Sequence, residues 1–124
     1  MKCKIAVFPG DGVGPEMIGE GIKVIEKAAE LGKFEVEWVK YPNGAEHYLE
    51  TKEELTEKIL EEIRNSCSAV YCGTVGIANG RKIQNIIRNY FAQFVSLMPI
   101  KLMPAVESPL ANKAGNEADF VVMK

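Results

Sequence analysis

The first part of the chain alternates between a compact apolar run and a longer, helix-like pattern. Residues 3–8 (CKIAVF) are mostly apolar and stop at a Pro-Gly pair, which is typical of a strand buried on both faces of a parallel sheet. From Pro15 to Gly32, apolar residues recur at helical spacing, with proline suited to the first helical position and glycine to the end. The pattern predicts a buried strand followed by an amphipathic helix.

The next segment repeats the strand-helix order. Residues 34–39 (FEVEWV) alternate apolar and acidic positions, which predicts a strand with one solvent-exposed face near the edge of a sheet. Residues 51–66 (TKEELTEKILEEIRNS) predict a helix, because their apolar positions line one face and Thr51 and Glu54 form a capping box.

The last third continues the alternation and then changes to strands. Residues 68–76 (SAVYCGTVG) predict a strand, and the apolar stripe of residues 83–94 predicts a helix whose stripe belongs to the core. Residues 94–104 and 118–124 predict two strands, although prolines restrict the pairing of the first. This order predicts an α/β fold with three layers, a mainly parallel sheet flanked by helices, in a single partial domain over residues 1–124.

Composition and charge argue against several classes of function. Fifteen basic and seventeen acidic residues give a net charge of -2, so no uniformly basic face is available for nucleic acid. The chain has no apolar stretch long enough for a membrane span and no signal-peptide pattern, so we expect a cytoplasmic protein that binds no membrane. Its three cysteines form no Cys-x-x-Cys pair, so we expect buried free thiols rather than disulfides or a zinc site.

Residues 9–16 (PGDGVGPE) form a glycine-rich turn between the first strand and the first helix. Its glycines permit positive φ angles and close approach of the backbone, and the amides of the following helix suit an anion. It is not a Rossmann fingerprint, because Pro15 stands where the third glycine belongs, and it lacks the Gly-Lys-Ser/Thr of a phosphate-binding P-loop. A tight connection without ligand and an anion site both remain open, and Asp11 is expected to cap the following turn or helix.

Residues 4–26 (KIAVFPGDGVGPEMIGEGIKVIE) resemble the amino-terminal signature of the isocitrate and isopropylmalate dehydrogenase family, the metal-dependent decarboxylating β-hydroxyacid dehydrogenases. NGAEHY, SAVYCGTVG, IIRNYFAQFVSLMPIKLMP and ADFVVMK are similar to later family segments in the same order. The resemblance covers the whole chain. It implies the first third of such an enzyme, namely part of the large domain and the first strands of the small one.

The resemblance also implies cofactors and a dimeric enzyme. Family members transfer hydride to NAD or NADP and use Mg²⁺ or Mn²⁺ in decarboxylation. The family's catalytic tyrosine, catalytic lysine and metal-binding aspartates correspond to positions beyond Lys124, so we expect no catalytic residue, no metal ligand and no stably bound cofactor in this chain alone. At one end of the sheet, two cofactor-binding walls are implied: Gly10, Asp11, Gly12 and Gly14 in one, and Gly73, Thr74 and Gly76 in the other.

The substrate-binding positions depart from the family. Arg88 matches the first of three arginines that clamp substrate carboxylates, Met98 replaces the second, and Lys124 stands at the third. Lys82 and Gln84 align near positions that carry small hydroxyl and amide groups in isocitrate-type members, and neither residue reproduces that type strictly. Each lost charge-assisted contact is expected to weaken binding by roughly 1.5–3 kcal/mol, so isocitrate specificity is not carried over and Arg88, Lys82 and Lys124 are the candidate substrate ligands.

Two functional hypotheses follow. The chain is either a segment of a decarboxylating dehydrogenase, inactive alone and completed by another polypeptide, or a non-catalytic pseudoenzyme that binds a small anion or regulates a full-length paralogue. Either way, part of a doubly wound domain leaves strand edges and helix faces uncovered, so we expect a homo-oligomer or a complex with a full-length paralogue. His47, the single histidine, lies in a polar stretch and is expected at the surface.

Overall fold

The chain forms two compact units in the computed structural model, Met1–Phe91 and Ala92–Lys124. The structure describes residues 2–53, 55–74, 80–103, 106 and 118–124. Each unit is considered by itself below. The expectation that residues 1–124 form one partial domain stays a prediction.

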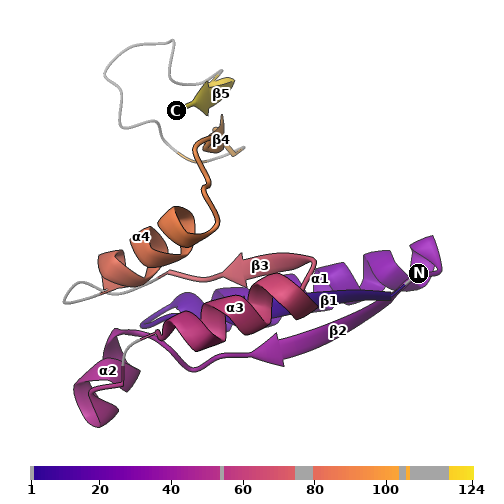
Figure 1. The fold of residues 1–124 in the computed structure, drawn as a ribbon. Helices are drawn as coiled ribbons and strands as arrows, with labels where there is room; N and C mark the ends of the chain where they lie inside the picture. The colour runs from indigo at the N-terminus through magenta and orange to yellow at the C-terminus, as the bar shows by residue number, and fades with distance from the viewer. Residues whose placement is uncertain (1, 54, 75–79, 104–105, 107–117) are drawn as a thin grey trace. The chain divides into compact units, whose positions relative to one another are not determined.

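A parallel sheet forms the centre of the first unit. Its strands are β1 (Lys2–Phe8), β2 (Glu35–Lys40) and β3 (Ala69–Cys72), in the order β2-β1-β3 (Figure 1). β1 pairs in parallel with both neighbours, and its last three residues are almost completely inaccessible to solvent. The apolar run at residues 3–8 therefore becomes the central strand, and the alternating run at 34–39 becomes an edge strand of the described sheet, both as predicted.

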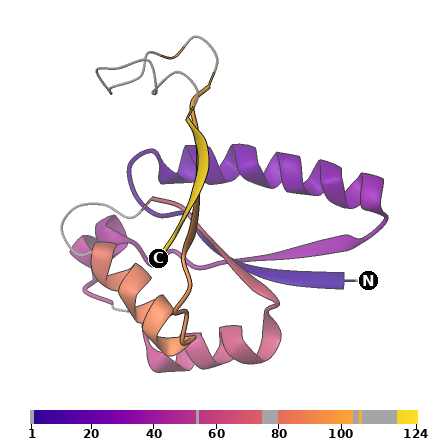
Figure 2. The same cartoon turned by 90° about the horizontal axis from the view of Figure 1, so that it is seen from above.

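Helices cover both faces of this sheet. α1 (Gly14–Gly32) lies on one face, and α3 (Glu57–Ser66) and α4 (Gly80–Tyr90) lie on the other (Figure 2). The indole nitrogen of Trp38 in β2 donates a hydrogen bond to Glu26 of α1 at 3.1 Å. These layers confirm the predicted three-layer α/β architecture with a parallel sheet.

The main core lies between the sheet and the α3–α4 layer. The Phe8 ring stacks on Tyr41 with a centroid separation of 5.3 Å. The buried members of this core are Ala6, Phe8, Tyr41, Leu55, Leu60, Ile63, Ile83 and Ile87. Burial of one large apolar side chain stabilises the fold by about 1.5–3 kcal/mol, so this cluster fixes both helices to the sheet.

The prediction of a single helix over residues 51–66 is wrong for its first half. A separate helix, α2 (Ala45–Thr51), ends where the predicted helix was expected to begin, and α3 covers only the second half. Thr51 is therefore the last residue of α2 and does not cap α3. Lys52 adopts a left-handed conformation with φ of 61°, which stops α2. The Thr56 hydroxyl accepts a hydrogen bond from the Ile59 amide and is the N-cap of α3. Thr56 provides the same chemistry as the predicted cap, five residues later.

The predicted apolar helix over residues 83–94 is also shorter than its stripe. α4 ends at Tyr90, and Ala92 adopts a positive φ of 51°. Ile83 and Ile87 of the predicted stripe are buried in the core, as expected, whereas Phe94 belongs to the second unit and is 87% exposed.

The second unit contains two antiparallel strands, β4 (Leu97–Lys101) and β5 (Asp119–Met123). Both strands fall within the predicted segments. Most of their apolar side chains are exposed on both faces of the pair. We call this pair the β4–β5 ribbon.

Pro99 fits the ribbon because of its register. Ser96 and Lys124 exchange both backbone hydrogen bonds at 2.9 Å, and Pro99 stands opposite Val121. Bonded and non-bonded pairs alternate in an antiparallel ladder, so the Pro99–Val121 pair is a non-bonded one. The missing N–H of Pro99 therefore faces the outer edge of β4 and costs the ladder no hydrogen bond.

Candidate functional site

Three turns meet at the carboxyl ends of the parallel strands. They are residues 9–13 after β1, 41–44 after β2 and 73–74 after β3, and we call them the carboxyl-end turns. The Tyr41 amide donates to the Val7 carbonyl and the Gly73 amide to the Phe8 carbonyl, each at 2.8 Å. In open α/β sheets, ligands bind outside the carboxyl ends of the strands. This edge therefore contains the candidate site.

The first and third turns touch each other directly. Gly10 has a φ of 79°, and a Cβ at this position would collide with the carbonyl of Thr74. The Asp11 amide donates to the Thr74 carbonyl at 2.8 Å, and the Thr74 hydroxyl donates to the Asp11 carbonyl at 3.2 Å. The two walls implied by the sequence are thus brought together, and the glycine permits their backbone contact.

Asp11 joins the second turn to the other two. Its carboxylate is buried and accepts hydrogen bonds from the amides of Ala45 at 2.8 Å and Glu46 at 2.9 Å, the first residues of α2. Its backbone carbonyl accepts from the Gly14 amide at 2.9 Å. The side chain therefore caps α2, more than thirty residues away in sequence, and not the helix that follows it. Gly44 lacks a capping side chain, so Asp11 supplies the cap.

The first turn of α1 offers few amides to an anion. The amides of Asp11 and Gly14 are used inside the protein, Pro15 has no N–H, and the Met17 amide donates to the Val13 carbonyl at 3.1 Å. The glycines of this turn are explained by the approach of Gly10 to the third turn and by the positive φ of Gly12. Binding of a cofactor phosphate at this turn stays a prediction.

A divalent ion has no prepared donor set in the described part of the chain. Hard cations require several carboxylate or carbonyl oxygens around one point. Among the described residues, no three side chains of His, Cys, Asp or Glu lie close enough together to hold a metal. These residues therefore do not fit the family's Mg²⁺ or Mn²⁺ by themselves.

The candidate substrate ligands are distributed over both units. Arg88 is exposed on α4, and no hydrogen bond or ion pair joins it to another described residue. Lys82 lies within α4, but its side chain is outside the described part, as is Gly76. Lys124 is exposed after β5 in the second unit. Met98, which replaces a family arginine, pairs with Val122 in the apolar β4–β5 ribbon.

Sequence reasoning missed a contact between α3 and α4. The Arg64 guanidinium donates to the Tyr90 carbonyl at 2.6 Å and lies 4.4 Å from the centre of the Tyr90 ring. This arrangement combines a charge-assisted hydrogen bond with a cation–π contact. Arg64 therefore has a structural role, whereas Arg88 has no partner among the described residues.

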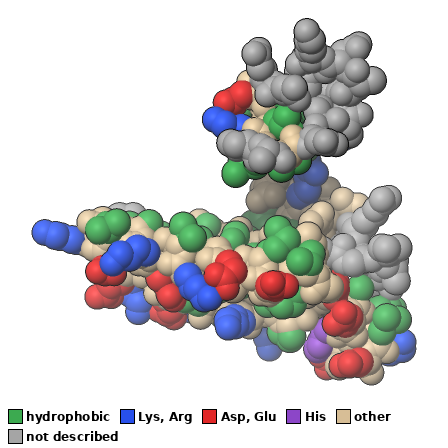
Figure 3. Space-filling view, turned by 180° about the vertical axis from the view of Figure 1, so that it is seen from behind, with side chains coloured by type: hydrophobic (Ala, Val, Ile, Leu, Met, Phe, Trp, Pro, Cys, Tyr) green, Lys and Arg blue, Asp and Glu red, His purple; other side chains and the backbone are tan. Residues whose placement is uncertain are grey.

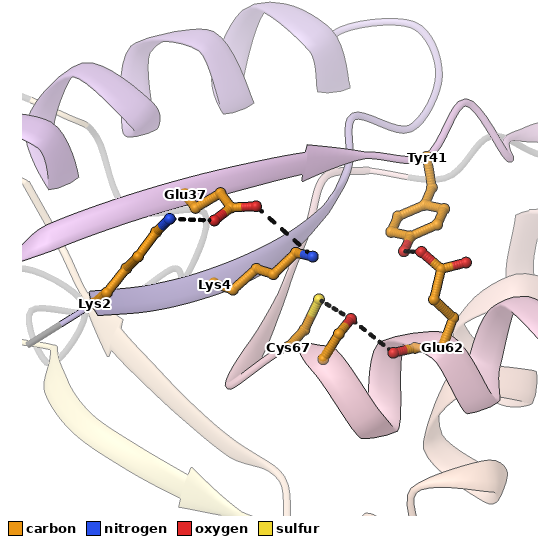
Figure 4. Close-up of polar contacts among 7 residues, drawn as sticks. Lys2, Lys4, Glu37, Tyr41, Glu62 and Cys67 are labelled. Atoms are coloured by element: carbon orange, nitrogen blue, oxygen red, sulfur yellow. Dashed lines mark hydrogen bonds and ion pairs between the residues drawn. The ribbon is translucent and has the colours of Figure 1, made fainter.

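Two further polar contacts of the first unit appear in Figure 4. The Tyr41 hydroxyl donates to Glu62 of α3 at 3.2 Å, and burial, with a smaller effect of the Glu62 carboxylate, raises the pKa of Tyr41 to about 12. On the sheet, Glu37 lies 2.7 Å from the Lys2 ammonium and 3.7 Å from that of Lys4. The Lys2 hydrogen bond and charge lower the pKa of Glu37, and Glu37 raises the pKa of Lys2.

The remaining sequence candidates are placed as follows. The three cysteines are free, as expected, but only partly buried, and burial raises the pKa of the Cys72 thiol.

His47 is not fully at the surface: its side chain is 21% exposed and its Nε2 lies 3.4 Å from the Glu53 carboxylate. None of the helices in the described part combines the length and apolar character that a bilayer span requires.

Comparison with solved structures identifies a protein of similar fold. The structure is similar to the apo form of a β-decarboxylating dehydrogenase from Thermococcus kodakarensis, with a TM-score of 0.57 and 24% identity, covering 98% of this chain and 41% of that one. At this identity, the likeness shows the fold alone.

Sequence comparison then gives the family. The profile of the isocitrate/isopropylmalate dehydrogenase family matches residues 4–124. Similar proteins include a 3-isopropylmalate dehydrogenase of Thermobifida fusca, 35% identical over 98% of this chain, and a decarboxylating D-malate dehydrogenase of Escherichia coli, 32% identical over 98%. The chain belongs to the isocitrate/isopropylmalate dehydrogenase family. It spans about 36% of the length of these two relatives.

Proposed function

We propose that this chain is the N-terminal segment of an NAD(P)- and metal-dependent dehydrogenase that oxidises and decarboxylates a 2-hydroxy acid of the isopropylmalate or isocitrate type. The observation that carries the proposal is the family match over residues 4–124, combined with coverage of about 36% of the relatives' length. When bound, the nicotinamide accepts hydride and the divalent ion polarises the substrate oxygen. The carboxyl-end turns contribute the nicotinamide-cofactor side of that site.

The chain is inactive by itself under this proposal and works in the cytoplasm. One observation supports inactivity: Met98 stands at a position where the family has an arginine that binds a substrate carboxylate. Under this proposal, the chain works together with a second polypeptide, either a full-length paralogue or a complementary segment.

The decisive experiment recovers the tagged chain from its own cells and identifies, by mass spectrometry, whatever co-purifies in stoichiometric amount. The purified chain and the recovered complex are then tested for NAD⁺ and NADP⁺ reduction with 3-isopropylmalate, D-malate and isocitrate. We expect turnover from the complex only. Turnover by the chain alone would overturn its inactivity, and recovery of the chain without a partner would favour the second candidate function.

The second candidate is a non-catalytic module that binds a small anion or regulates a full-length paralogue. It is favoured by Arg88, a cation on α4 that has no partner among the described residues. Calorimetric titration with 3-isopropylmalate tests it on the wild-type chain, on Arg88→Gln and on Lys58→Gln, an exposed change on α3. Loss of affinity in Arg88→Gln alone supports this candidate, and equal affinities in all three contradict it.

A further inference from the structure

A cavity of about 410 Å³ lies in the first unit at the end opposite the carboxyl-end turns. It is formed where α1 ends and where β1 and β2 begin, and it is lined by Lys2, Ala29, Glu30, Lys33, Phe34 and Glu35. We call it the amino-end pocket. Basic, acidic and hydrophobic side chains occur together at this end of the first unit in Figure 3. Small-molecule sites have volumes of about 300–1,000 Å³, so the amino-end pocket can hold one small metabolite.

The tight connection between α1 and β2 shapes the amino-end pocket. The Lys33 amide donates to the Glu30 carbonyl at 3.3 Å. The Phe34 amide donates to the Ala29 carbonyl at 3.1 Å, which closes the last turn of α1. Gly32 leaves room for the Phe34 ring, because a Cβ on Gly32 would come within 2.8 Å of that ring. Phe34 is therefore held against the backbone, and it remains 36% exposed as an apolar contact surface.

Two of the four charged side chains at the amino-end pocket are paired inside the protein. Lys2 and Glu30 each form an ion pair of 2.7 Å with a residue that does not line the pocket. Among the described residues, no hydrogen bond or ion pair joins the side chain of Lys33 or of Glu35 to another residue. Both side chains belong to exposed residues. One ammonium and one carboxylate are therefore available to a ligand in the same pocket.

We propose that the amino-end pocket binds an α-amino acid with an apolar side chain. The Lys33 ammonium pairs with the α-carboxylate of the ligand, and the Glu35 carboxylate pairs with its α-ammonium. Lys33 and Glu35 are two residues apart, so their Cα atoms lie within about 7 Å of each other. Their long side chains can therefore reach two charged groups that are separated by a single carbon atom.

The combination of charges and ring selects this class of ligand. A simple anion would lie beside the Glu35 carboxylate, and a simple cation would lie beside the Lys33 ammonium, so the two residues favour a zwitterion. The Phe34 ring favours an apolar side chain, because their contact removes apolar area from water. The inference goes beyond the proposed function, since it uses no residue of the carboxyl-end turns.

Calorimetric titration of the full chain with L-phenylalanine tests the proposal. We expect saturable binding of one molecule per chain. 3-Phenylpropionate lacks the ammonium and 2-phenylethylamine lacks the carboxylate, so each should bind about tenfold or more weakly than L-phenylalanine. Glycine lacks the apolar side chain and should also bind more weakly. Absence of saturable binding of L-phenylalanine, or equal affinity for 3-phenylpropionate, would overturn the proposal.

Charge-neutral variants assign the two ends of the ligand. Lys33→Gln and Glu35→Gln should each weaken L-phenylalanine binding about tenfold or more, whereas the control Lys23→Gln, an exposed change on α1 outside the pocket, should bind as wild type does. Lys33→Gln should also discriminate less against 2-phenylethylamine, and Glu35→Gln less against 3-phenylpropionate. Circular dichroism checks that all three variants fold. Unchanged affinity in Lys33→Gln and Glu35→Gln, or an equal loss in Lys23→Gln, would refute the assignment.

Discussion

Gly10 and Gly12 belong to one turn but differ in their surroundings. Both have positive φ, 79° and 57° respectively. A Cβ on Gly10 would strike the backbone of Thr74, whereas a Cβ on Gly12 would have no other described atom within 4 Å. The first position is therefore restricted by conformation and by contact, and the second by conformation alone.

Alanine substitution should separate these two effects. Gly12→Ala is expected to lower the free energy of unfolding by about 1 kcal/mol, the cost of a left-handed conformation for a residue with a Cβ. Gly10→Ala adds the displacement of the Thr74 backbone and should cost about 3 kcal/mol or more in total. Urea unfolding of both variants measures the difference, and equal losses would contradict the close contact of the first and third turns.

Asp11 is the residue on which the second turn depends. Asp11→Ala leaves the amides of Ala45 and Glu46 without their acceptor. The hydrogen bond to Ala45 is buried, and a buried unsatisfied group costs about 1–3 kcal/mol. We expect faster hydrogen exchange at these two amides, together with a smaller effect in Asp11→Asn, which keeps one acceptor oxygen. Unchanged exchange in Asp11→Ala would show that the cap is dispensable.

Asp11 also shows which features of the turn at residues 9–16 could be predicted from sequence and which could not. The turn residues 9–16 identified the positions that need glycine, because glycine preference is a local property of the backbone. The partner of Asp11 could not be derived locally, since it comes from the meeting of the β1 and β2 ends. Once the structure shows that α2 begins after Gly44, the need for a distant cap is clear, because glycine has no side chain that can cap a helix.

Among the elements, strands and the first helix followed their patterns more closely than the middle helices did. β1, α1 and β2 were predicted within one or two residues, because periodicity and breakers agreed there. The segment 51–66 contained two threonines that could each begin a helix. Burial of Leu55 and the left-handed Lys52 decided between them, and both depend on packing.

The β4–β5 ribbon has two unequal outer edges. Pro99 removes an outward N–H from the β4 edge, whereas Val121, its opposite residue, presents an N–H on the β5 edge. Exposed strand edges with free donors template further pairing, and proline blocks it. Any added strand should therefore join the ribbon at β5.

Substitution of Pro99 tests whether the β4 and β5 edges of the ribbon differ in this way. Pro99→Ala and Pro99→Val both restore an outward donor, so both should aggregate sooner than wild type in light scattering on heating, the valine more strongly because of its strand preference. Val121→Pro should keep the bonds of the ribbon and aggregate later. If neither Pro99 variant aggregates sooner, the proline does not protect this edge.

For the whole molecule, family and function rest on different kinds of observation. The family is readable from sequence because the motif order extends over residues 4–124, and the parallel sheet confirms the architecture. Substrate binding stays a prediction, because Arg88 belongs to the first unit and Lys124 to the second, and each unit is described by itself. Spacing in sequence indicates the residue types that a site uses, whereas their arrangement depends on tertiary packing.

Alkaline pH should destabilise the molecule through Tyr41. An unfolded tyrosine has a pKa of about 10, whereas burial raises the pKa of Tyr41 to about 12 in the folded chain. The unfolded state therefore loses its proton first, so stability is fully present below pH 10 and decreases as pH rises from about 10 to 12. Urea unfolding across this range should show the decrease in wild type.

Tyr41→Phe provides the matched control. It keeps the ring that stacks on Phe8 and removes the ionisable hydroxyl and its hydrogen bond to Glu62. We expect the variant to be less stable than wild type at neutral pH, by about 1 kcal/mol for one lost hydrogen bond, and to lose less stability between pH 10 and 12. Other groups titrate equally in both chains, so the difference between the two curves reports Tyr41. Parallel curves would mean that Tyr41 ionises as easily in the folded chain as in the unfolded one.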